Sequence, residues 1–218
     1  MINRRRFLQS LAVTAATPSA VFARDDALSG FGALVKDPQG LLDLPEGFTY
    51  TIIAHMGEEM NDGLLVPGRP DGMATFDVGD GTIRIICNHE LGPRNQDLGP
   101  FGESLERLET VDPARIYDPG DGTSPGTGGT TTIHYNPQTK ERLGIHMSLA
   151  GTEINCAGGP TPWGSWLSCE ETFTDPGTGF ERGSAVHRER RHGYIFEVPA
   201  AADGLVDPVP LTQMGRFE

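Results

Sequence analysis

The sequence predicts an all-β protein built as a β-propeller. Helical periodicity is scarce along the chain, whereas short β-branched or alternating runs recur between turn residues. Gly (29) and Pro (17) make up about a fifth of the 218 residues, which favours many turns and few long helices. The predicted strands are residues 48–54, 72–76, 82–87, 130–135, 143–149, 163–168, 194–198 and 209–214.

An internal repeat groups these strands into blades. Residues 85–90 align with residues 166–171, which places Glu90 over Glu171. Four short antiparallel strands repeated in sequence are typical of propeller blades, which take roughly 40 to 50 residues each before loop insertions. We therefore expect roughly the first two to three blades, in a chain truncated at Glu218, where another blade would begin. The first set of strands is 72–76, 82–90, 130–135 and 143–149, and the second is 156–162, 163–171, 194–198 and 209–214.

Two long excursions interrupt the strands. Residues 91–128 are rich in Gly, Pro and Asp and contain one predicted helical turn at 105–108. Residues 175–191 end in the basic run His187-Arg188-Glu189-Arg190-Arg191. We predict a solvated face for this run, with an anion-contacting loop as the alternative.

The first 23 residues read as an export signal. Residues 3–9 match the twin-arginine pattern, and a modest apolar run and the small-residue site Val21-Phe22-Ala23 follow. We expect the twin-arginine export machinery to recognise residues 1–23 and to deliver a bacterial periplasmic or secreted protein. Residues 24–218 then form the N-terminal portion of the propeller domain. No later run reaches the 18 apolar residues of a membrane span, so stable membrane insertion is not expected.

The net charge constrains the class of partner. A formal charge of −13 is the wrong sign for binding a phosphate backbone, so no nucleic-acid partner is expected. An acidic protein that handles an anionic small molecule needs bound cations to reverse the local field, and carboxylates are suitable ligands for them.

The stretch from Asn155 to Glu171 concentrates the residues that carry chemistry. It holds two thiols, two carboxylates and two tryptophans. Because equivalent positions of successive blades converge on the central channel, we expect Glu90 and Glu171 to project into one pocket beside Cys156. Carboxylates bind hard cations such as calcium, and a thiolate favours a softer metal such as iron or zinc. The sequence therefore predicts a mixed metal site.

The remaining polar and apolar residues near these ligands have several interpretations. Asn88, His89, Asn155 and Glu170 either support the ligands or simply face outward. The other two thiols, Cys87 and Cys169, are predicted to be buried as small hydrophobes. The two tryptophans, Trp163 and Trp166, are predicted to pack within a blade.

Distinctive motifs are spread over nearly the whole mature chain. The most specific is the Asn155–Glu171 block, and together the motifs resemble the PhoX-type alkaline phosphatases. The others are residues 3–9, Asp71-Gly72-Met73, Cys87-Asn88-His89-Glu90, Gly128-Gly129-Thr130, His192-Gly193-Tyr194 and Gly215-Arg216-Phe217-Glu218.

This resemblance implies a secreted six-bladed propeller that hydrolyses phosphate monoesters at a site holding calcium and iron. By the same resemblance, Cys156 matches an iron-binding cysteine, Glu171 and Glu218 match metal ligands, and Glu90 corresponds to a ligand on the calcium side. No Ser or Thr stands in a convincing nucleophile setting, so a metal-bound oxygen is the expected nucleophile. Family members run beyond Glu218, and their later blades supply further ligands and a phosphate-contacting arginine.

Other classes of function remain open from the sequence. A calcium-stabilised propeller can act as a binding module without catalysis, and an incomplete fragment can be a partial scaffold only. Phytase-like and lactonase-like propeller hydrolases also depend on calcium. The Cys156 thiol argues against the last two, because sites built only for calcium use oxygen ligands.

Overall fold

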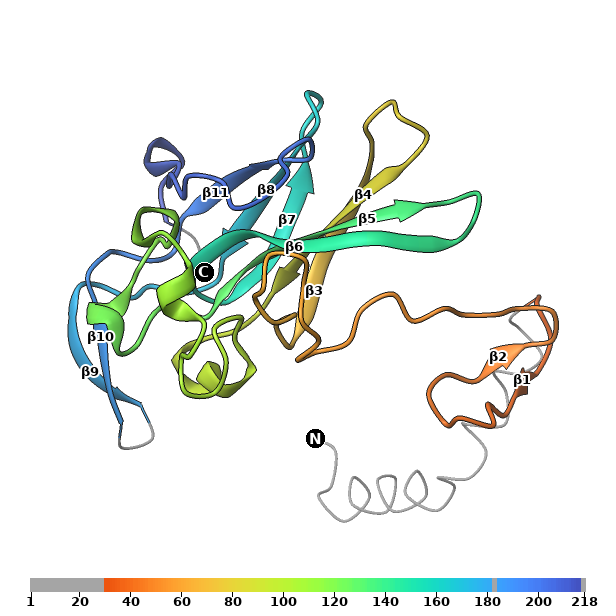
Figure 1. The fold of residues 1–218 in the computed structure, drawn as a ribbon, viewed down its shortest axis with the longest axis horizontal. Coiled ribbons are helices and arrows are strands. Elements are labelled where there is room, and N and C mark those ends of the chain that lie inside the picture. The colour runs from red at the N-terminus through yellow and green to blue at the C-terminus, as the bar shows by residue number, and fades with distance from the viewer. Residues whose placement is uncertain (1–29, 182–183, 217–218) are drawn as a thin grey trace, which may run out of the picture. The chain divides into compact units, whose positions relative to one another are not determined.

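The computed structural model describes residues 30–181 and 184–216 (Figure 1). The chain divides into two compact units, Met1–Ile52 and Ile53–Glu218. The predicted export signal, residues 1–23, lies outside the described residues, and so does Glu218. None of the described helices is long and apolar enough to cross a membrane.

The described part of the first unit is a small hairpin. Strands β1 (Leu34–Val35) and β2 (Leu44–Pro45) pair antiparallel. The Asp37 carboxylate closes the connection, because it accepts hydrogen bonds from nearby backbone N–H groups and from the Tyr50 hydroxyl at 2.7 Å.

The second unit begins with a four-stranded antiparallel sheet. Its order is β3-β4-β5-β6, which matches the first predicted set of strands. In the turn between β3 and β4, Asp77 and Asp80 accept hydrogen bonds from the N–H groups of Gly79 and Thr82, both at 2.8 Å. The strands are β3 (Pro70–Asp77), β4 (Ile83–His89), β5 (Gly128–Asn136) and β6 (Glu141–Thr152).

A three-stranded antiparallel sheet follows, in the order β11-β8-β7. Its strands are β7 (Asn155–Pro160), β8 (Ser165–Glu170) and β11 (Ile195–Pro199). The strand predicted at 209–214 is wrong: one bridge joins Phe196 to Pro210, and a 3₁₀ helix, η5, occupies Thr212–Met214. Pro208 and Pro210 lack the N–H groups that a further ladder needs.

Other segments also differ from the prediction. Residues 48–54 form no strand. A hairpin of β9 (Gly177–Glu181) and β10 (Ser184–Arg188) fills the second excursion. The long loop carries short 3₁₀ helices in place of one helical turn at 105–108: η1 (Pro93–Leu98), η2 (Leu108–Thr110), η3 (Pro113–Arg115) and η4 (Gly120–Gly122).

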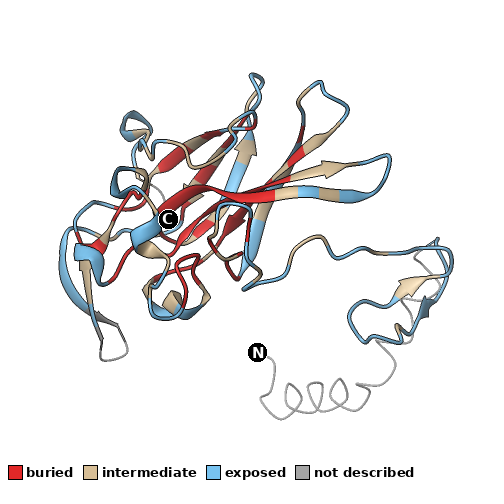
Figure 2. Cartoon of the chain, in the orientation of Figure 1, coloured by how far each residue is buried: buried red, intermediate tan, exposed pale blue. Residues whose placement is uncertain are grey.

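The core joins the two larger sheets. One cluster of buried side chains includes Ile86 of β4, Trp166 of β8 and Phe196 of β11, so these sheets pack against each other. A second cluster, with Ile133 and Met147, lies where β5 and β6 meet the long loop. Figure 2 shows the buried positions along the middle of the sheets and the exposed ones at the hairpin ends.

The structure confirms the all-β prediction at the level of small antiparallel sheets with little helix. Within the described ranges, no sheet closes on itself. The propeller arrangement therefore stays a prediction.

Candidate functional site

Two β-bulges place Cys156 next to the start of β3. The register of β3 shifts between Pro70 and Met73, and that of β7 shifts between Asn155 and Gly158. A Cβ atom on Gly72 would lie 2.7 Å from the carbonyl oxygen of Cys156, so only glycine permits this approach. Because bulges re-aim side chains and are common next to active sites, the backbone itself sets the position of the thiol.

The Asn88 side chain holds the second bulge in place. It is fully buried, and its amide nitrogen donates to the carbonyl oxygens of Cys156 (2.8 Å) and Ala157 (2.9 Å). Its amide oxygen accepts from the Trp166 indole (2.9 Å) and from the Ser168 hydroxyl (2.8 Å). All four hydrogen-bonding positions of the amide are used, so Asn88 supports the backbone under Cys156.

Asn155 extends this buried network from the other side. Its amide nitrogen donates to Ser168 Oγ at 2.9 Å, and its amide oxygen accepts from Thr152 Oγ1 at 2.7 Å. Ser168 in turn donates to Asn88. The chain of hydrogen bonds fixes β4, β7 and β8 to one another below Cys156.

Cys156 lies among carboxylates. Its partial burial, a hydrogen bond with Glu171, and the negative charges of Asp71, Glu171 and Glu90 raise the pKa of the thiol to about 11. Glu171 therefore contacts the Cys156 thiol, and Glu90 lies within electrostatic range of it, as does Asp71, which the sequence did not indicate as a ligand. A bound cation would reverse this electrostatic effect and favour the thiolate.

Backbone hydrogen bonds connect the ends of β4 and β8 through Ile154. The N–H of Ile154 donates to Leu91 O at 2.8 Å, and the N–H of Glu171 donates to Ile154 O at 2.9 Å. The N–H of Glu90 donates to Arg69 O at 2.9 Å. Glu90 and Glu171 thus follow equivalent strands that meet on either side of Ile154.

The carboxylates and the thiol are not drawn into one tight group. Within residues 30–181 and 184–216, no three His, Cys, Asp or Glu side chains lie close enough to hold a metal ion. The predicted ligand Glu218 lies outside these ranges. Asp71 and Glu171 are exposed, and Glu90 and Cys156 are partly exposed, so solvent reaches all four residues.

His89 has a packing role. Its ring is buried, Nδ1 donates to Gly68 O at 2.9 Å, and Nε2 accepts from Thr131 Oγ1 at 3.0 Å. Burial lowers the pKa of His89 to about 4, so the ring is neutral at physiological pH. Both nitrogens are occupied, and neither is directed to a ligand.

Glu170 belongs to a buried acid–imidazole–acid arrangement. Its Oε1 accepts from His192 Nδ1 at 2.7 Å, and His192 Nε2 donates to Asp118 Oδ2 at 3.1 Å. All three side chains are buried. Burial works to lower the pKa of His192, but the hydrogen bonds with Asp118 and Glu170 outweigh it and raise that pKa to about 9. Glu170 is therefore tied inward while the adjacent Glu171 faces the solvent.

A buried ion pair lies beside this arrangement. Arg188 Nε donates to Glu153 Oε1 at 2.6 Å, and both side chains are buried. The prediction of a solvated face for the basic run is wrong at Arg188, although Glu189 and Arg190 are exposed. The partners are 35 positions apart in the sequence, so no local pattern could reveal the pair.

The burial of the tryptophans and of the other two thiols agrees only in part with the prediction. Trp166 is buried, but Trp163 is 71% exposed and donates to Glu197, so the prediction that Trp163 packs inside the sheet is wrong. The three cysteines, all in the described ranges, are free thiols. Cys87 is buried and Cys169 is partly buried.

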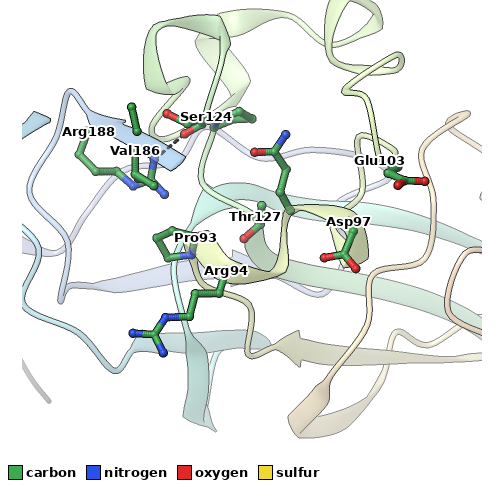
Figure 3. A pocket seen from close by; sticks show the side chains of 11 residues that line it. Pro93, Arg94, Asp97, Glu103, Ser124, Thr127, Val186 and Arg188 are labelled. Atoms are coloured by element: carbon green, nitrogen blue, oxygen red, sulfur yellow. Dashed lines mark hydrogen bonds between the residues drawn. The ribbon is translucent and has the colours of Figure 1, made fainter. Parts of the chain in front are cut away.

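Cavities surround the start of η1. One of about 360 Å³ is lined by residues that include Ser124, Thr127 and Arg188 (Figure 3). Another of about 310 Å³ contains Glu90 and therefore adjoins the carboxylates around Cys156. The sequence placed this segment in a long loop and gave no sign of a cavity.

These features define a class: a mostly β protein with an acidic, thiol-bearing site built where its sheets meet. A comparison with known protein families identifies the family within this class. The family model of the alkaline phosphatase PhoX matches residues 29–141 and 123–218, and the chain belongs to this family. The family resemblance seen in the motifs is thereby confirmed. No curated protein and no solved structure matches the chain.

Proposed function

We propose that this protein is a metal-dependent phosphatase that hydrolyses phosphate monoesters with calcium and iron. The family is one of hydrolases. The single observation that supports the metal-dependent site is the grouping of the Cys156 thiol with the charges of Asp71, Glu90 and Glu171.

The donor chemistry suits the two metals. A thiol suits iron, and carboxylate oxygens suit calcium. Burial and the neighbouring carboxylates keep the Cys156 thiol protonated. The repulsion among these negative charges is unfavourable, and a bound cation would relieve it. The residues that would hold the ions are Cys156, Glu171 and Glu90, with Glu218 as a further ligand.

The bound cations would supply charge neutralisation at the phosphate oxygens and an activated oxygen nucleophile. The task of this chain's other residues is positioning. Asn88 and Asn155 fix the bulge that carries Cys156. Glu170 and His192 fix the end of β8, from which Glu171 extends. Rigid positioning of this kind is what electrostatic catalysis requires.

The proposal includes the cellular setting and the architecture. Residues 1–23 would direct twin-arginine export to the periplasm or beyond, and the sheets would be blades of a propeller. The substrates would be small-molecule phosphate esters.

Hydrolysis of p-nitrophenyl phosphate by the exported protein tests this function. Activity should disappear on chelation and return with calcium plus iron, and Cys156→Ala should abolish it. Cys169→Ala is the matched control, because it removes a thiol from β8 without touching the cluster. Full activity in Cys156→Ala would contradict the thiol's role. Calcium binding without hydrolysis would favour a non-catalytic binding module.

A further inference from the structure

Two arginines line the cavity of about 310 Å³ that adjoins the carboxylates around Cys156. Arg69, Glu90, Arg94 and Ile154 are among the residues that line it. Since Glu90 also acts on the Cys156 thiol, the cavity and the acidic cluster are neighbours. This placement puts guanidinium groups next to the candidate metal ligands.

Two residues that line this cavity have a left-handed backbone. Arg69 has φ +48° and Ile154 has φ +49°, a left-handed conformation that non-glycine residues seldom adopt and that is a clear outlier for a β-branched residue. Such a conformation persists only where the surroundings enforce it. Here the hydrogen bonds from Glu90 N to Arg69 O and from Ile154 N to Leu91 O enforce it.

The arginines have the chemistry of an anion site. A guanidinium presents planar paired donors that match the oxygens of a phosphate. Among the described residues, no carboxylate forms a salt bridge with Arg69, and its side chain is exposed. Arg94 lines both cavities, and Figure 3 shows its guanidinium pointing away from Ser124 and Thr127 of the larger one.

We infer that Arg69 and Arg94 form a binding site for the phosphate group of the substrate. The guanidinium groups contact its non-bridging oxygens from one side, and the cluster of Cys156, Glu90 and Glu171 lies on the other. The identity of the anion rests on the proposed function.

Titration calorimetry with inorganic phosphate on the metal-loaded protein tests the site. Arg69→Asn is the suitable variant, because asparagine tolerates a left-handed backbone while removing the guanidinium. Arg69→Asn and Arg94→Gln should each weaken phosphate binding by about tenfold or more. Lys140→Asn is the control: it also removes one positive charge at an exposed left-handed position, φ +60°, and should leave the affinity unchanged.

The outcomes separate this inference from the proposed function. Unchanged phosphate affinity in the Arg69→Asn, Arg94→Gln double variant overturns the inference, even if hydrolysis and metal content persist. Absence of phosphate binding by the unmodified protein overturns it as well. Phosphate binding that depends on both arginines, in a protein without hydrolytic activity, supports the site and contradicts the proposed function.

Discussion

Substitution of His192 is the sharpest test of how the site is supported. The imidazole is fully buried between the carboxylates of Glu170 and Asp118. His192→Gln keeps much of the side-chain volume and one hydrogen bond but removes the positive charge. It leaves two buried carboxylates facing each other without a cation between them, which is strongly unfavourable.

The expected loss of folding free energy in His192→Gln is about 3 kcal/mol by two independent arguments. Breaking a buried ion pair by removing one partner costs about 3–5 kcal/mol. Backbone N–H groups of Gly193 and Tyr194 still bond to Glu170, which favours the lower end. Independently, raising the pKa of His192 from 6.5 to about 9 corresponds to about 3 kcal/mol. For a chain of this length, that loss lowers Tm by roughly 6–12 °C.

The same change alters the pH dependence of stability. Because the folded-state pKa of His192 is raised, its contribution is fully present below pH 6.5 and is lost as the pH rises through about 9. The free energy of unfolding, measured by urea denaturation, should therefore fall between pH 6.5 and 9 in the unmodified protein and stay flatter in His192→Gln.

The matched control is His55→Gln, which makes the same substitution at an exposed histidine and should leave both stability and its pH profile unchanged. A loss under about 1 kcal/mol in His192→Gln would refute the reasoning, since two buried carboxylates left without the cation between them should cost more than that. An unaltered slope between pH 6.5 and 9 would refute the assignment of the titration to His192.

The remaining predictions concern the bulge that carries Cys156. Asn88→Ala should destabilise the fold by about 2–4 kcal/mol in urea unfolding, because it leaves buried hydrogen-bonding groups unpaired; a loss under 1 kcal/mol would mean that water replaces the amide. Gly72→Ala should displace Cys156 and reduce metal content, measured by elemental analysis, since the added Cβ would meet the Cys156 carbonyl at 2.7 Å. Gly159→Ala, on the same strand as Cys156 but open to solvent, should retain the metal; equal losses in both variants would argue against a steric cause.

Local patterns were sufficient for most of the strands. The runs around β3, β4, β5 and β6 alternate or are β-branched and are separated by clear turn residues, so each was placed within a few residues of its observed range. The predicted strand at 209–214 failed because its prolines cannot complete a ladder.

Part of the site could also be read from the sequence. The repeat placed Glu90 and Glu171 at equivalent strand ends, and in the structure the charges of both act on the Cys156 thiol. Their role as metal ligands stays a prediction. Glu218 and the export signal lie outside the described residues, so those predictions stand as they were made.

The support of the site could not be predicted, because it depends on pairs that are remote in the sequence. Asp118 and His192 are 74 positions apart, and Asn88 and Cys156 are 68 apart. Such pairs depend on how loops fold over the sheets, and hydrophobic periodicity carries no information about that. The pattern predicted a strand at 156–162 but not the bulge at Cys156, since a bulge is recognisable only from its partner strand.

The central claim is that the Cys156 thiol and its neighbouring carboxylates hold the metal ions of a phosphatase. Elemental analysis of iron and calcium in the purified Cys156→Ser variant, beside Cys169→Ser, tests it most directly. We predict that Cys156→Ser loses its iron while Cys169→Ser keeps the metal content of the unmodified protein. Iron retained in full by Cys156→Ser would contradict the claim.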